Sequence, residues 1–390
     1  MIESFYLLSL IFVLLILKPH PSSMVFVFLV NFLSGFTPIV TTLINYDLVL
    51  FDSELVFKLL LAFNISIAIF HIVFLIFRTR KEIFINRNNY KYSRLFFYLF
   101  SLAALIVVYQ NVSLGVHVIS EGYIAGYKSA SEQSIKATSF FPFALIFYFL
   151  LFLYFLKEKR YIYLFIMSFI VVSYFMYGSR SFFLYTTISI LVFLILLKKI
   201  TYKQCFLLAV LFIPIIVLAG AFREGGDGEG ASIFLRMAIE LANIPMILSN
   251  INVLDDLNQS IILVFLTTLP QSLIVPLGIE PLNSLATEFV LNFDPGWAEA
   301  GGGFGFTILG EIYYRFGYFG LLVIPYVIVF FLNHLEKKFL VADVFDRALI
   351  LTCYYGILMW VRGDFIEISR LLLIVLFFYY AKRMVYRNDR

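Results

Sequence analysis

The chain has 390 residues, of which 62% are hydrophobic, 19% aromatic and only 14% charged. Soluble domains carry about 25% charged residues, so this composition excludes a soluble enzyme, gives no reason to expect a nucleic-acid partner, and predicts a polytopic membrane protein. The formal net charge is +4. Because charges are costly in hydrocarbon, the charged side chains must lie at interfaces or line a cavity.

Apolar runs long enough for membrane helices recur along the whole chain. They predict an all-α integral membrane protein with about eleven transmembrane helices, roughly 10 to 13, in a single transmembrane domain over residues 1–390. The first run follows Glu3 and precedes KPHPSS, so we expect it to remain as a helix instead of being cleaved as a signal peptide. The runs lie at about 4–17, 24–44, 55–77, 95–119, 139–156, 161–177, 182–197, 204–221, 318–334, 348–361 and 366–381.

Lysine and arginine concentrate in alternate loops, notably 78–94, 157–160 and 198–203, and in the tail KRMVYRNDR. Cytoplasmic loops carry this excess, so the C-terminus is predicted to be cytoplasmic. The opposite, outer side then receives one long loop, residues 222–317. We expect this loop to contain an amphipathic helix around SIFLRMAIELANIPMIL and a proline-centred hairpin at 261–278.

Signals for metals and disulfides are weak. Cys205 and Cys353 lie in apolar runs without supporting spacing, and we expect both to pack in the core. Asp227 and Glu229 in GGDGEG lack a recognisable ligand spacing. The sequence therefore predicts no metal and no cofactor.

From Ser179 onward, every cation assigned to the outer side is an arginine, and none is a lysine. Arginine presents a planar fork of donors that binds phosphate bidentately, so arginines gathered at one membrane face suit a lipid diphosphate. The alternative is that each pairs with a nearby acid, as Arg370 would with Glu367. These outer arginines are Arg180, Arg223, Arg236, Arg315, Arg362 and Arg370.

Four motifs follow in a characteristic order over about residues 175–370: GSRSFFL (178–184), AFREGG at the start of the long loop, GGGFGFTILGEIYYRFGYFG (301–320) and WVRGDF (360–365). In this order the sequence resembles the Wzy-type O-antigen polymerases, which are oligosaccharide repeat unit polymerases. Arg315 is a departure, because the family often has a small polar residue such as Asn there.

The resemblance implies a GT-C-like multi-helix fold shared with O-antigen ligases, located in the bacterial cytoplasmic (inner) membrane with the 222–317 loop in the periplasm. It implies an inverting, metal-independent glycosyltransferase that moves the growing glycan from undecaprenyl diphosphate to the non-reducing end of the next lipid-linked unit. A chain-length regulator is an expected partner. An O-antigen ligase and a polysaccharide flippase are the alternatives, although a transporter is expected to show repeated halves, which the sequence lacks.

The leaving diphosphate gains negative charge, which preorganised cations stabilise. Glu311 and His117 are candidates to accept the proton of the attacking hydroxyl; alternatively, Glu311 pairs with Arg315 at i+4 and His117 only packs or caps a helix. The predicted diphosphate-binding residues are Arg180, Arg223, Arg362 and, next, Arg315, and the predicted sugar-binding residues are Trp297, Tyr313 and Asp294.

The glycines at 301–303 are expected to let the backbone turn sharply and approach a neighbour closely. GEIYYRFG is then predicted to begin a helix that runs on into a span ending near Asn333. In such a helix, Arg315 lies one turn after Glu311 on the same face.

Overall fold

The computed structural model describes mainly residues 2–43, 51–77, 141–176, 180–205, 241–255, 261–269, 274–278, 282–299 and 303–387. Helices dominate these ranges, and no strand occurs within them, which confirms the all-α prediction. The chain divides into two compact units. The first comprises Met1–Glu82, Gly228–Glu336 and Gly356–Arg370, and the second comprises Ile83–Asp227, Lys337–Tyr355 and Leu371–Arg390.

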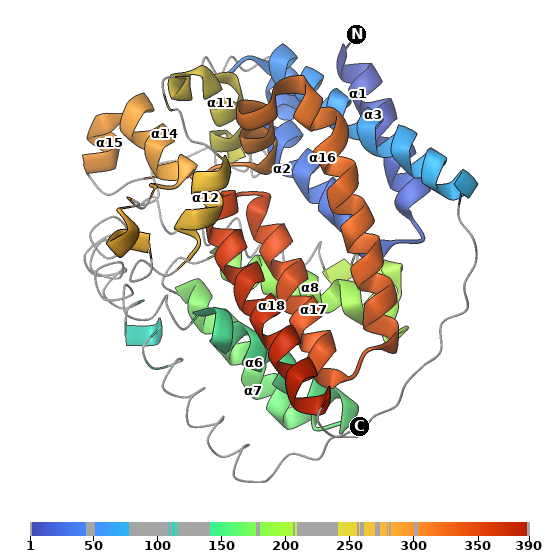
Figure 1. The fold of residues 1–390 in the computed structure, drawn as a ribbon. Helices are drawn as coiled ribbons and strands as arrows, with labels where there is room; N and C mark the ends of the chain where they lie inside the picture. Colours follow the sequence, from blue (N-terminus) through green and yellow to red (C-terminus); the bar gives the residue numbers. More distant parts are fainter. Residues whose placement is uncertain are drawn as a thin grey trace. The chain divides into compact units, whose positions relative to one another are not determined.

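Three N-terminal helices of the first unit pack against one another: α1 (Ile2–Leu17), α2 (Pro21–Leu43) and α3 (Ser53–Phe77), drawn in blue in Figure 1. Asn31 of α2 and Asn64 of α3 exchange two hydrogen bonds of 3.0 Å through their side-chain amides. Polar side chains buried between apolar helices in this way satisfy each other and hold membrane helices together.

Among the described helices, three are long and apolar enough to cross a membrane: α2, the Ser53–Ile72 part of α3, and α16 (Ile308–Val341). They confirm a membrane protein. Described helices also coincide with the other predicted runs, except 95–119 and 204–221, which lie mostly outside the described residues. The total of eleven spans, the orientation and the layout of the loops stay predictions.

Short helices occupy the described part of the 222–317 region. Within 261–278 the described residues form two short pieces, α12 (Ile261–Thr267) and η2 (Val275–Leu277), and the hairpin itself stays a prediction. Around Phe289 and Phe306, an apolar cluster joins the remaining pieces to the start of α16. The pieces in this cluster are α11 (Asn243–Ser249), η1 (Ile251–Leu254) and α14 (Leu285–Phe293), while α15 (Pro295–Glu299) packs against α14.

Helix α16 is broken at Gly317, which has φ 57° and ψ −153°. This region of backbone space is essentially restricted to glycine, so a residue with a Cβ would be strained there. The helix predicted to run on from GEIYYRFG is thus present, but it has a break at Gly317 that the sequence does not predict. Residues 308–316, which we call the outer piece because the sequence predicts that they lie on the outer side, run in a different direction from the long remainder of α16, as Figure 1 shows near the α16 label.

In the second unit, α7 (Tyr161–Met176) packs against both α6 (Phe141–Lys157) and α8 (Arg180–Leu196). The unit also contains most of α17 (Val344–Trp360) and of α18 (Phe365–Arg387). The Lys382 ammonium contacts the carboxylates of Asp343 and Asp346, the latter at 2.8 Å. Cys353 is buried as expected, Cys205 is half-buried, and both are free thiols.

Candidate active site

The predicted site residues fall into three groups. Glu311, Tyr313 and Arg315 lie on the outer piece of α16, and Arg362 lies in the turn between α17 and α18. Asp294 and Trp297 lie at the start of α15. Arg180 is the first residue of α8 in the second unit, and its side chain lies outside the described structure, as do the residues His117, Arg223 and Arg236.

Glu311 joins three segments of the chain through one buried carboxylate, whose side chain is 2% exposed. Its Oε1 accepts a hydrogen bond from Arg315 Nε at 2.8 Å, so the i+4 ion pair anticipated from sequence is present. Its Oε2 accepts from the Trp360 indole Nε1 at 2.8 Å and from the backbone N of Phe365 at 2.7 Å. Since Phe365 begins α18, Glu311 caps that helix from outside it.

Among the described residues, the Arg315 guanidinium is hydrogen-bonded through Nε alone. Its side chain is 6% exposed, and Nη1 and Nη2 are buried without a hydrogen-bond partner among the described residues. A buried donor left unpaired costs free energy, and more so when it carries charge. The Nη pair forms the fork that matches a phosphate or carboxylate group. An anion at this position would therefore relieve the cost.

Arg362 lies close to the glycine-rich segment. A Cβ on Gly305 would lie 3.4 Å from the Arg362 carbonyl oxygen and 3.9 Å from its Cγ, and Gly305 has a φ of +76°. Both facts favour glycine at this position. Gly301 and Gly302 lie outside the described residues, and a Cβ on Gly303 would meet nothing within 4 Å. Gly305, which the sequence analysis did not single out, is thus the glycine that permits a close approach.

A pocket of about 240 Å³ opens beside this glycine. Trp297 neighbours the lining residue Ala298, and its indole Nε1 is buried without a hydrogen-bond partner among the described residues. The Asp294 carboxylate accepts from the Trp297 backbone N at 2.9 Å and so caps α15. The pocket is lined by Ala286, Thr287, Val290, Leu291, Ala298, Gly303 and Gly305.

Sequence reasoning missed Trp360 and the Phe365 backbone as partners of Glu311. WVRGDF is one of the four motifs, but the sequence predicts no role for its tryptophan. Its residue type was the one available clue, because the indole N–H of a buried tryptophan usually donates a hydrogen bond to an acceptor. Tyr313, predicted to bind sugar, is half-buried against the apolar cluster, with its ring 5.2 Å from that of Tyr318. Within the described residues, no group of His, Cys, Asp and Glu is arranged to hold a metal ion.

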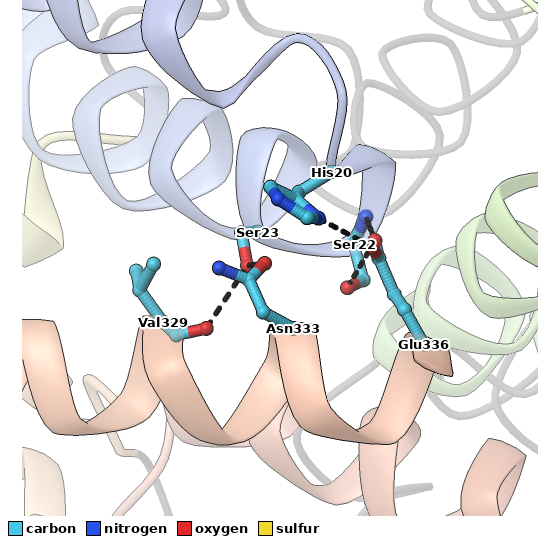
Figure 2. Close-up of polar contacts among 6 residues, drawn as sticks. All are labelled: His20, Ser22, Ser23, Val329, Asn333 and Glu336. Atoms are coloured by element: carbon cyan, nitrogen blue, oxygen red, sulfur yellow. Dashed lines mark hydrogen bonds and ion pairs between the residues drawn. The ribbon is translucent and has the colours of Figure 1, made fainter. Parts of the chain in front are cut away.

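A second buried carboxylate, Glu336, lies near the other end of α16 (Figure 2). Its Oε1 accepts from the backbone N and from the Oγ of Ser22, both at 2.6 Å, and its Oε2 lies 3.1 Å from His20 Nδ1. Ser23 Oγ donates to Asn333 Oδ1 at 2.7 Å. Because Ser22 lies in the first turn of α2, Glu336 caps α2 in the same way that Glu311 caps α18.

The fold and the site together define a helical membrane protein with a buried arginine fork that is suited to an anion. The sequence model of the family described as O-antigen polysaccharide polymerase Wzy matches residues 1–388. The chain therefore belongs to this family, which confirms the resemblance and extends it over the first 170 residues. It is an integral inner-membrane, glycosyltransferase-like polymerase that acts on lipid-linked oligosaccharide repeat units. Searches of curated proteins and of solved structures found no match.

Proposed function

We propose that the protein transfers the growing glycan from undecaprenyl diphosphate to the non-reducing end of the next lipid-linked repeat unit, at the periplasmic face and with inversion at the anomeric carbon. The observation that carries this proposal is the Arg315 guanidinium, with two buried nitrogens that have no partner among the described residues. Family membership favours polymerisation over the ligase and flippase alternatives.

The reaction breaks the bond between C1 of the donor sugar and the diphosphate oxygen, and the acceptor hydroxyl attacks C1 from the opposite face. Arg315 and Arg362, with Arg180 and Arg223, stabilise the negative charge that develops on the diphosphate, without a metal ion. The hydroxyl proton passes to Glu311 or His117. The sugars bind near the 240 Å³ pocket, against Trp297, Tyr313 and Asp294. The C-terminus is cytoplasmic, and a chain-length regulator is the expected membrane partner.

The test is a strain that lacks this protein and is complemented with Arg315→Ala, Arg362→Ala or the control Arg383→Ala. The control removes an arginine of α18 that lies over the Tyr379 ring, 4.6 Å from its centroid. We expect both site variants, compared with the native protein at equal protein level, to leave a single repeat unit on the lipopolysaccharide core, because loss of a charge-stabilising donor slows such reactions about 10²–10³-fold. The control should retain long chains.

Other patterns of lipopolysaccharide chain length on a gel would contradict the proposal. Normal long chains in both site variants would rule out the arginine clamp. Loss of even the single repeat unit in the deletion strain would indicate a ligase, and accumulation of untransferred units on the cytoplasmic face would indicate a flippase.

A further inference from the structure

The carboxylate of Glu311 is occupied by donors from the protein itself. Arg315 Nε donates to one oxygen, while Trp360 Nε1 and the Phe365 backbone N donate to the other. A general base must have a lone pair within hydrogen-bond reach of the hydroxyl that it deprotonates. With a side chain that is 2% exposed and three described donors on its two oxygens, Glu311 has little room to receive a substrate hydroxyl.

Protonation of Glu311 would also remove the compensating charge of Arg315. The two side chains are both buried, and their contact is the ion pair of 2.8 Å. A buried cation deprived of its partner is strongly unfavourable. A proton acceptor in this position would therefore oppose the reaction at the step where the negative charge on the leaving diphosphate needs Arg315 in place.

The same contacts suit a different task, and we propose that Glu311 is the positioning residue of a two-arginine clamp. This inference rests on the proposed function. The bond from Arg315 Nε fixes the plane of the guanidinium and leaves the Nη1 and Nη2 edge for the phosphate oxygens. A fork held in this way is preorganised, so it need not reorient when the diphosphate binds.

Glu311 also places the second arginine. Trp360 and Phe365 flank Arg362 in the turn between α17 and α18, and both donate to the same Glu311 oxygen. One carboxylate thus ties the turn that carries Arg362 to the helix that carries Arg315. Glu311 therefore fixes the backbone position of Arg362 relative to Arg315, and the acceptor proton goes to another group.

The test measures binding of undecaprenyl diphosphate alone to the purified full-length protein in nanodiscs, without an acceptor, and in parallel the pH profile of turnover. Glu311→Gln should weaken binding about ten- to a hundredfold, the range expected for losing hydrogen bonds to a charged group. The residual turnover of this variant should keep the pH dependence of the native protein. The matched control is Glu336→Gln, which changes a buried glutamate of the same helix and should bind undecaprenyl diphosphate normally.

A double mutant shows whether Glu311 acts on ligand binding through Arg315 or independently of it. If Glu311 acts through Arg315, Glu311→Gln should add little further loss of binding to Arg315→Ala, because the two residues act as one unit. Unchanged binding in Glu311→Gln, with turnover lost along with its acidic limb, would overturn the inference and restore Glu311 as the base. If Glu311→Gln does not fold, Glu311→Asp keeps the charge but is shorter by one methylene, and native binding by that variant would equally overturn it.

Binding by Arg315→Ala distinguishes a failure of the proposed function from a failure of the positioning role of Glu311. If Arg315→Ala binds undecaprenyl diphosphate as well as the native protein does, the proposed function fails at the clamp itself. If Arg315→Ala loses binding while Glu311→Gln retains it, only the positioning role of Glu311 is wrong.

Discussion

The two buried glutamates of α16 make similar contacts but form different kinds of polar cluster. Glu311 caps α18 and binds Arg315, whereas Glu336 caps α2 and contacts His20. The difference lies in the basic partner. The guanidinium of Arg315 keeps two buried nitrogens without a partner among the described residues, whereas every contact described for the Glu336 carboxylate contributes to anchoring the start of α2. In this protein, a buried carboxylate therefore indicates a binding site only where its basic partner still has hydrogen-bond donors without a described partner.

The largest expected effect on stability comes from Glu336→Ala, which tests whether the Glu336 cluster serves only to anchor α2. The change removes the acceptor for the Ser22 backbone N and Oγ and for His20 Nδ1. Loss of a helix cap and of buried hydrogen bonds should cost about 2 kcal/mol of unfolding free energy. The thermal midpoint in detergent should fall, while turnover per folded molecule stays normal.

Glu336→Gln is the control for that measurement, because its amide oxygen can still accept both hydrogen bonds from Ser22 and the loss of stability should be smaller. A large fall in turnover per folded molecule in either variant would contradict the purely structural interpretation of this cluster.

A second, smaller effect is expected from Gly317→Ala, which tests whether the outer piece must leave the direction of α16. Since the φ of 57° and ψ of −153° are essentially restricted to glycine, the substitution should cost about 1–2 kcal/mol or straighten the helix. A straightened helix would move Glu311 and Arg315 together. Binding of undecaprenyl diphosphate should therefore weaken, and the thermal midpoint should fall.

Gly278→Ala is the matched control for Gly317→Ala. Gly278 has a φ of +74° and, like Gly317, no atom within 4 Å of an added Cβ. The Gly278→Ala variant should therefore lose stability through the same kind of backbone strain but bind undecaprenyl diphosphate normally. Equal loss of binding in both variants would show that the break at Gly317 has no specific role in the site.

The smallest effect is expected from Gly305→Ala, which tests whether the turn with Arg362 belongs to the Glu311 cluster. A Cβ there would lie 3.4 Å from the Arg362 carbonyl oxygen, and the φ of +76° adds backbone strain. We expect a loss of about 1 kcal/mol of stability and a several-fold fall in turnover as Arg362 shifts. If turnover falls no further than in Gly278→Ala, the contact between Gly305 and Arg362 does not contribute to the site.

Local features of the sequence predicted much of the molecule. Hydropathy predicted helices close to their observed bounds, as for the run 55–77 and helix α3 (Ser53–Phe77). Spacing alone gave the Glu311–Arg315 pair as the alternative to a proton-accepting role for Glu311, because residues four apart on a helix are neighbours. The break at Gly317 was not predicted, because glycine is common in membrane helices and its presence does not reveal the sign of φ.

The sequence by itself determined the membrane class, the positions of the long helices that the structure describes and the family, because these depend on composition, on local periodicity and on motifs along the chain. Tertiary structure alone decided that Trp360 and Phe365, about fifty residues from Glu311, occupy its second oxygen. It also decided that Arg315 keeps its Nη1 and Nη2 atoms buried without a described partner. Such contacts depend on how distant segments pack, and buried donors reveal a candidate site only when their partners can be examined in three dimensions.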